Sequence, residues 1–211
     1  MTNLTNSTNL INEIKNVCVY SSSSNKLDEI YYQVAREMGI LIGKSGFNLV
    51  YGGGSLGTMF KNAQAVKEFG GMVYGVLPKK LHELGVGNNF CDILHVTEEM
   101  RSRKEKLDKL SDAIIALSGG FGTLEELAEM IVQKQLGYNK KAIVILNTNG
   151  FYDHLLNFFD VIISQNFATD DAAEIYFVAK TPDEAIEYLI NYQPSEYDIT
   201  EKWLKKQELR S

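Results

Sequence analysis

A glycine-rich turn followed by two acids holds the residues of this sequence that are best suited to chemistry. The stretch reads Ser118-Gly119-Gly120-Phe121-Gly122-Thr123-Leu124-Glu125-Glu126, and it lies between an apolar run over 113–117 and a helical pattern over 123–136. A glycine turn between a strand and a helix points free backbone N–H groups and the positive end of the helix dipole at an anion. We predict that Thr123 caps this helix and offers its hydroxyl to a phosphate, with both acids in the first helical turn.

Two further loops have a related composition. One reads Ser21-Ser22-Ser23-Ser24-Asn25 and follows an apolar run over 17–20, and the other reads Gly52-Gly53-Gly54-Ser55-Leu56-Gly57 and follows a run over 47–51. Taken alone, each loop is explained equally well as a tight turn that binds no ligand. Because ligands of doubly wound sheets bind at the carboxyl ends of the strands, three such loops on one edge together indicate a ligand site.

The second loop satisfies the spacing G-x-G-x-x-G, which is typical of dinucleotide-binding turns. That fingerprint also requires an acid at the end of the next strand, where it binds a ribose hydroxyl. The corresponding residues here are Gly75-Val76-Leu77-Pro78-Lys79, and none is acidic. The sequence G-x-x-x-x-G-K-[ST] of ATP-binding P-loops does not occur. We therefore disfavour both NAD and a P-loop nucleotide.

A predicted helix over 98–110 carries four basic residues: Arg101, Arg103, Lys104 and Lys106. Charge runs on helices are usually solvated faces. From the residue types alone this explanation is favoured over a role for Arg103 or Lys104 in the site.

Strands and helices are expected to alternate along the chain. Strands are predicted over 17–20, 47–51, 72–77, 92–96 (at an edge), 113–117, 142–146 and 175–178, helices over 27–44, 58–69, 98–110, 123–136, 152–165 and 182–192, and a loop over 79–90. This alternation, with strands that are apolar on both faces, is typical of a covered parallel sheet. The predicted fold class is α/β, a Rossmann-like, doubly wound three-layer sandwich with a mainly parallel central sheet.

The predicted domain is single and covers residues 15–192. Residues 1–14 are rich in Asn and Thr and are predicted to form a disordered leader, not a signal peptide. Residues 193–211 form a C-terminal tail that holds Trp203 and Leu204 among charges, and it either adds a last helix or stays loose.

Composition excludes several classes of function. The 211 residues carry a net charge of −6 without a separate Lys/Arg cluster, so we expect no nucleic-acid partner. No apolar run is long enough for a membrane span. Cys18 and Cys91 lie in apolar surroundings, which favours buried thiols in a reducing, cytoplasmic location. The sequence has neither C-x-x-C nor H-E-x-x-H, so no metal is predicted.

Taken together, these motifs resemble those of the Lonely Guy (LOG) family of cytokinin riboside 5′-monophosphate phosphoribohydrolases, long mislabelled as lysine decarboxylases. The family motif P-G-G-x-G-T-x-x-E is matched over 118–126, and V-Y-G-G-G-x-x-G-x-M is matched over 50–59. The family's Arg-Lys pair after a methionine is matched by Met100, Arg103 and Lys104, and its serine-rich first loop by 21–23. The similarity runs in order over residues 17–192.

The resemblance implies hydrolysis of the N-glycosidic bond of a nucleoside 5′-monophosphate, giving free base and ribose 5-phosphate. It assigns Glu126 to the ribose hydroxyls and to the oxocarbenium-like charge or the attacking water. It assigns Arg103 to substrate orientation and transition-state charge. The implied substrate-binding residues are Ser22, Gly53, Gly54, Ser55, Thr58, Met100, Lys104, Gly119, Gly120, Gly122, Thr123 and Glu125. It also implies a homodimer or larger homo-oligomer with the site near the subunit interface, and no cofactor.

Two departures from the family pattern keep alternatives open. Ser118 replaces the family's proline, which is expected to make the entry of the loop less rigid. Gln133 replaces a tryptophan, so the choice between prenylated adenines and plain AMP stays open. A non-catalytic nucleotide-binding module of the same superfamily is the main alternative, although it would lack the Arg103 and Glu126 pair. A pyridoxal-phosphate lysine decarboxylase is disfavoured, because no lysine stands out as a Schiff-base residue.

Overall fold

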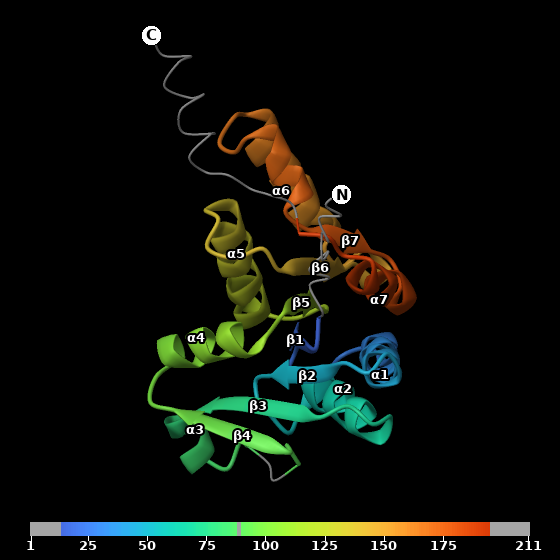
Figure 1. Ribbon diagram of the computed structural model, residues 1–211, viewed down its shortest axis with the longest axis vertical. Helices are drawn as coiled ribbons and strands as arrows, with labels where there is room; N and C mark the ends of the chain where they lie inside the picture. The colour runs from blue at the N-terminus through green and yellow to red at the C-terminus, as the bar shows by residue number, and fades with distance from the viewer. Residues whose placement is uncertain (1–13, 88–89, 195–211) are drawn as a thin grey trace, which may run out of the picture.

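Seven parallel strands form the centre of the molecule, in the order β4-β3-β2-β1-β5-β6-β7 (Figure 1). The computed structural model describes residues 14–87 and 90–194. The strands are β1 (Asn16–Tyr20), β2 (Asn48–Tyr51), β3 (Val73–Pro78), β4 (Ile93–Thr97), β5 (Ala113–Ala116), β6 (Ala142–Leu146) and β7 (Phe177–Ala179). The predicted α/β fold with a parallel central sheet is confirmed.

Helices cover both faces of this sheet. They are α1 (Glu29–Lys44), α2 (Gly57–Glu68), α3 (Lys79–Glu83), α4 (Met100–Leu110), α5 (Phe121–Gln135), α6 (Asp153–Ser164) and α7 (Pro182–Ile190), with short 3-10 turns at Thr148–Gly150 and Asp170–Glu174. Helices α1, α2 and α7 lie on one face and α4, α5 and α6 on the other (Figure 1). The layers are therefore those of a three-layer sandwich.

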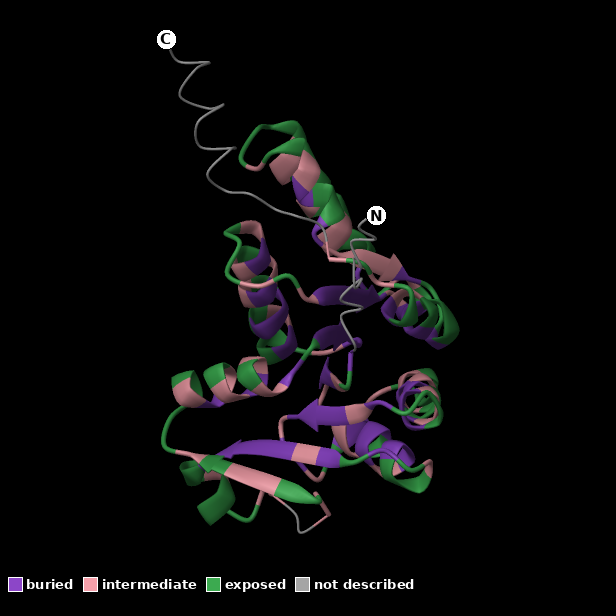
Figure 2. Ribbon diagram, viewed as in Figure 1, coloured by how far each residue is buried: buried purple, intermediate pink, exposed green. Residues whose placement is uncertain are grey.

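Alternate residues of the central strands build two separate cores. In β1, Val17 and Val19 face the core under α1, α2 and α7, whereas Cys18 faces the core under α4 and α5. All five residues of β6 are buried, which explains why its sequence shows no polar alternation (Figure 2).

The strand order reverses at β1. The chain proceeds from β1 to β4 toward one edge and then returns to place β5 on the other side of β1. The three loops predicted to bind a ligand follow β2, β1 and β5, which are direct neighbours. They therefore meet at the carboxyl end of the sheet around the switch point, the usual ligand position in such folds.

Several predicted boundaries were wrong. Helix α5 begins at Phe121 with Gly120 at the N-cap, so Thr123 is not the cap and no acid lies in the first turn. The predicted loop over 79–90 contains helix α3. The last strand is Phe177–Ala179, because Ile175 lies at the end of a 3-10 turn instead. The predicted edge position of β4 is confirmed.

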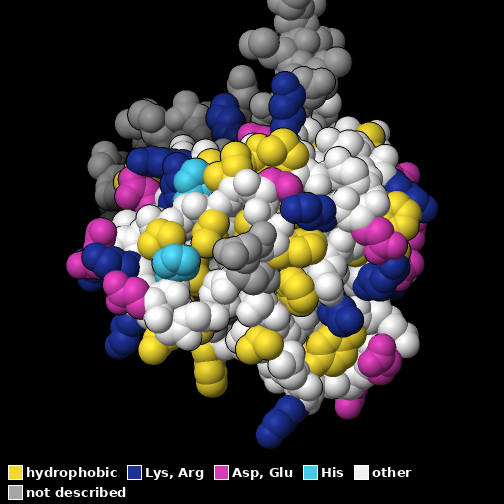
Figure 3. Space-filling model, turned by 90° about the horizontal axis from the view of Figure 1, so that it is seen from below, with side chains coloured by type: hydrophobic (Ala, Val, Ile, Leu, Met, Phe, Trp, Pro, Cys, Tyr) yellow, Lys and Arg dark blue, Asp and Glu magenta, His cyan; other side chains and the backbone are white. Residues whose placement is uncertain are grey.

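The leader predicted over 1–14 lies almost entirely outside the described residues, as does most of the tail predicted over 193–211. Among the described helices, none combines the length and apolar character that crossing a bilayer requires. Within the same residues, no three His, Cys, Asp or Glu side chains are grouped as metal ligands. The face on the side of β4 carries acidic and basic side chains intermingled with apolar ones (Figure 3).

Candidate functional site

A buried ion pair joins the two residues assigned to catalysis. The Nη1 of Arg103 on α4 lies 2.7 Å from Oε1 of Glu126 on α5, and each side chain is only about one-tenth exposed. Arg103 Nε also donates to the carbonyl of Val76 in β3. The contact between Arg103 and Glu126 joins two residues that are 23 positions apart in the sequence, and it lies beside the switch point of the sheet.

The burial of Arg103 contradicts the solvated-face interpretation of the basic helix. Arg101 on α4 is exposed, but Arg103 and Leu107 point inward together. They are four residues apart and therefore lie on the same helix face. The signal in the sequence was the position of Arg103 on the apolar stripe of α4, which charge composition alone does not reveal.

Gly52 makes room for this arginine. A Cβ added at Gly52 would lie 2.5 Å from Arg103 Nη2, closer than real Cβ contacts occur. The first glycine of the second loop therefore lets the guanidinium pass the end of β2. This function of Gly52 was missed by sequence reasoning, which considered it only as part of a fingerprint.

A second, more exposed ion-pair group lies beside the first. Lys104 Nζ pairs with Glu125 and, at 2.8 Å, with Oε2 of Glu129. Since both acids belong to α5, the lysine ties α4 to α5 next to Arg103. Glu129 was also missed, although it lies one helical turn after Glu125 and so shares its face. Met100, at the start of α4, is half exposed.

The loop between β5 and α5 places its glycines around the helix start. Gly120 occupies the N-cap, and a Cβ at Gly120 or Gly122 would meet nothing within 4 Å, so both face open space. A Cβ at Gly119 would instead collide with Thr123. The hydroxyl of Thr123 donates to the carbonyl of Ser21, 3.0 Å away. The predicted Thr123 hydroxyl thus fastens the first loop to α5 in this structure.

The first and second loops are also fastened to each other. Thr58 Oγ1 accepts from the Ser22 N–H at 3.0 Å and donates to the Ser22 carbonyl at 3.2 Å. Asn25 accepts from the N–H of Gly57, which opens α2. Ser55 donates to the Val86 carbonyl, outside this contact group. Gly53 and Gly54 lie between these contacts, and Gly53 has a φ of 71° that favours glycine.

Tyr152 supports the third loop from behind. Its phenol is buried and donates to the carbonyl of Leu117, 2.7 Å away, directly before Ser118. Burial raises the pKa of Tyr152 far above its ordinary value, so the phenol keeps its proton for this bond. The Ser118 hydroxyl is itself buried and donates to no described residue.

Burial governs the electrostatics of Glu126. The loss of water raises the pKa of this carboxyl, while the charge and hydrogen bond of Arg103 lower it, and the net shift is upward. A carboxylate in such surroundings is a stronger base than an exposed one. A buried carboxylate and guanidinium beside a glycine-rich helix start can hold an anionic sugar phosphate and stabilise a developing positive charge.

The chain matches known proteins over most of its length. Residues 59–189 match a family model described as possible lysine decarboxylase. The cytokinin riboside 5′-monophosphate phosphoribohydrolase LOG of Oryza sativa subsp. japonica is 39% identical over 189 residues, covering 90% of this chain and 78% of that protein. LOG5 of Arabidopsis thaliana, with the same enzyme name, is 38% identical over 181 residues, covering 85% of this chain and 79% of that protein.

Solved structures share the fold. The molybdenum cofactor carrier protein of Chlamydomonas reinhardtii is 26% identical, with a TM-score of 0.64 and coverage of 83% of this chain and 95% of that one. The molybdenum cofactor binding protein of Rippkaea orientalis is 25% identical, also with a TM-score of 0.64, and covers 83% of this chain and 94% of that one.

Proposed function

This chain belongs to the LOG family of phosphoribohydrolases, and we propose that it hydrolyses the N-glycosidic bond of a purine or cytokinin-type nucleoside 5′-monophosphate. The products are the free base and ribose 5-phosphate. The single observation that carries this proposal is the buried Arg103–Glu126 ion pair beside the glycine-rich start of α5.

Each part of the site has a chemical task in the proposed reaction. The open N–H groups around Gly120 and Gly122 receive the 5′-phosphate at the positive end of α5. Glu126 then faces the ribose, where a carboxylate stabilises the oxocarbenium-like charge or activates water. Arg103 orients the substrate with its planar fork of donors and balances the charge of Glu126. Lys104 and Glu125 flank this pair on the exposed side.

A binding protein without hydrolytic activity is the second candidate. It is favoured by the structural similarity to proteins named as molybdenum cofactor carriers. The same fold can carry different functions, so the site has to decide between them. The Arg103–Glu126 pair has no evident task in a carrier, and this supports the hydrolase.

A lysine decarboxylase, as the family-model description suggests, receives less support. Contrary to the expectation from the sequence, one lysine does stand out: Lys134 is buried, and burial lowers its pKa to about 8. However, Lys134 follows Thr123 along α5 by a distance of about 16 Å at 1.5 Å per residue. It donates to Tyr192 at the other end of the helix and is remote from the phosphate loop.

We propose that the active unit is a homodimer or larger homo-oligomer in the cytoplasm. None of the residues of α6 is fully buried, and Phe158 and Val161 expose 58% and 43% of their surface. Phe121, at the start of α5 beside the phosphate loop, is 91% exposed. Large exposed apolar groups support a subunit contact near the site. Both cysteines are free thiols, as is usual in a reducing compartment.

The test is product analysis after incubation with AMP and with isopentenyladenosine monophosphate. The hydrolase is expected to release free base from at least one of them, and Glu126→Gln is expected to abolish release. Glu129→Gln serves as the control, because it removes a neighbouring acid of the same helix and leaves the buried pair intact. If neither nucleotide is cleaved while either raises the melting temperature, the carrier function is supported instead.

The same measurement defines the preferred base. Gln133 lies on α5 seven residues after Glu126, close to the same helix face. A polar side chain in place of an aromatic one offers less apolar surface to a prenyl group. We therefore propose that this chain discriminates less between AMP and prenylated nucleotides than its Gln133→Trp variant does, which the ratio of the two rates measures.

A further inference from the structure

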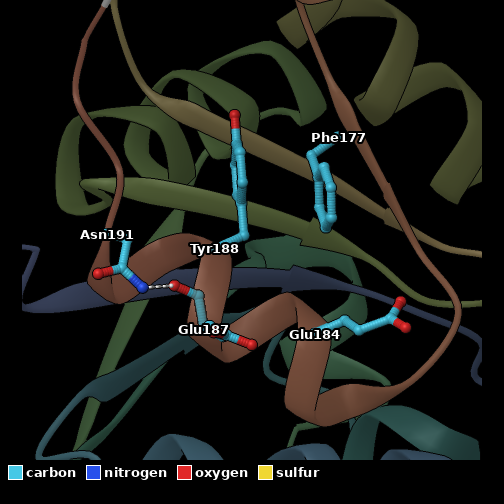
Figure 4. A pocket seen from close by; sticks show the side chains of 5 residues that line it. All are labelled: Phe177, Glu184, Glu187, Tyr188 and Asn191. Atoms are coloured by element: carbon cyan, nitrogen blue, oxygen red, sulfur yellow. Dashed lines mark hydrogen bonds between the residues drawn. The ribbon is translucent and has the colours of Figure 1, made fainter.

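A groove of about 220 Å³ lies between β7 and α7, two strands away from β5 and its phosphate loop. The rings of Phe177 and Tyr188 stand parallel beside it, with centroids 4.4 Å apart and an interplanar angle of 7° (Figure 4). Glu184, Glu187 and Asn191 complete its lining. Because pockets for small ligands usually enclose about 300–1,000 Å³, this groove is better suited to one large side chain than to a nucleotide.

The end of the described chain is fixed next to this groove. Asn191 lines the groove, and Tyr192 follows directly. The Tyr192 hydroxyl donates to the Lys140 carbonyl at 2.8 Å and accepts from Lys134 Nζ at 3.1 Å. These two bonds anchor the chain where it leaves α7. From Pro194, the last described residue, the chain can span up to about 30 Å to Trp203 if extended, so the groove is easily within reach.

The residues that follow are chemically complementary to the groove. The core of the segment 195–211, residues 202–206, reads Lys-Trp-Leu-Lys-Lys and is basic around the apolar pair Trp203-Leu204, whereas the four acids of the segment lie outside this core, at Glu196, Asp198, Glu201 and Glu208. The groove offers two aromatic rings beside two acids, Glu184 and Glu187, both exposed. An aromatic ring prefers to pack on other rings, and basic side chains favour a position near carboxylates. The other terminal segment, 1–13, has no aromatic and no basic residue and does not match.

We propose that the C-terminal segment 195–211 docks in this groove of its own chain. Trp203 packs against Phe177 and Tyr188, and the basic residues around it lie beside Glu184 and Glu187. Docking covers the outer edge of the sheet at β7, which would otherwise present unpaired backbone groups to other chains. This proposal does not depend on the hydrolytic function of the site.

Trp203 is the only tryptophan of the chain, so tryptophan fluorescence of the full-length protein reports on this segment alone. In the folded protein we expect emission at shorter wavelength than in the urea-unfolded chain, and several-fold weaker quenching by acrylamide. Tyr188→Ala removes one ring of the groove. It should shift the emission wavelength and the acrylamide quenching of Trp203 toward the values of the unfolded chain. Glu187→Lys should shift both fluorescence properties part of the way, and it does not disturb the core because Glu187 is exposed.

Two matched variants serve as controls. Tyr138→Ala removes an exposed tyrosine just beyond α5, the helix that packs on the other core from α7, and Glu37→Lys reverses an exposed acid on α1. Both are expected to leave the fluorescence of Trp203 unchanged. AMP hydrolysis, measured in parallel, should be unaffected by all four variants.

Three results would overturn the proposal. Trp203 could be as accessible to acrylamide in the folded protein as in urea. It could be protected equally in the wild type, Tyr188→Ala and Glu187→Lys, which would put it elsewhere on the surface. Its protection could also be lost on dilution, which would mean that a second copy supplies the segment.

Discussion

Gly52 and Arg103 occupy adjoining space so closely that a single methyl group on Gly52 would lie 2.5 Å from the guanidinium Nη2. The loop after β2 and helix α4 can therefore lie this close only because residue 52 has no side chain. The direction of the Arg103 guanidinium toward Glu126 depends on this absence.

Gly52→Ala is therefore expected to displace the guanidinium and to reduce kcat/KM for AMP by more than tenfold. Gly52→Ala in an Arg103→Ala background is the comparison, because the added Cβ then has no guanidinium to displace. Circular dichroism establishes that the variants fold. An equal additional loss in that background would argue against a specific effect on Arg103.

Removal of one partner of the buried ion pair is expected to destabilise the protein. Arg103→Ala leaves the Glu126 carboxylate buried without its counter-charge, which typically costs about 3–5 kcal/mol. The double variant Arg103→Met with Glu126→Leu removes both charges and should recover most of this loss. Urea unfolding measures the difference. Arg101→Ala, on the exposed face of α4, should change the free energy of unfolding little.

The pH dependence of hydrolysis should report the raised pKa of Glu126. The proposed reaction uses the ionised carboxylate, so the rate falls as the pH falls through this pKa. Because burial raises the pKa, the acid limb of kcat/KM should lie above the value of about 4.3 that is usual for an exposed glutamate. The charge of Glu125 adds to this shift, and Glu125→Gln should therefore move the limb to lower pH. The role assigned to Glu126 would be contradicted if the acid limb of kcat/KM lay at the usual glutamate pKa of about 4.3 and did not move in Glu125→Gln.

The proposed subunit contact can be tested on α6. Phe158 is 58% exposed, and Phe158→Asp places a charge on the apolar surface of this helix. If this surface is the interface, light scattering at micromolar concentration should give the mass of a monomer for the variant and of an oligomer for the parent. Leu84→Asp, on a leucine near β4 that is even more exposed than Phe158, should not change the mass. A monomeric parent protein would refute the proposed assembly.

Much of the fold follows from local patterns in the sequence. The strands are short apolar runs bounded by glycine or serine loops, and their alternation with helices leaves few arrangements other than a parallel sheet. The three ligand-facing loops were recognisable because phosphate cradles require small residues at the ends of strands. The error at the start of α5 arose because its first two residues, Phe121 and Gly122, have low helix propensity and lie within the glycine-rich motif, so the helix was expected to begin only at Thr123.

The site could be predicted only in part, because its central contacts join residues distant in the sequence. Periodicity places Arg103 beside Leu107 on the inner face of α4, but only the fold shows that Glu126 meets it there. The steric contribution of Gly52 depends on the separation of two elements, which no local pattern encodes. The assigned roles of Arg103 and Glu126 in hydrolysis stay predictions until the experiments above are made.

The hydroxyls of Thr123 and Thr58 hold two consecutive carbonyls, those of Ser21 and Ser22, from opposite sides. The first loop is consequently held between α5 and α2 by contacts within the protein itself. Binding then requires little ordering of the backbone, and the entropic cost that flexible loops impose on affinity is largely avoided. A cradle prepared in this way selects ligands by shape, and its association rate should be set by diffusion and orientation rather than by loop closure.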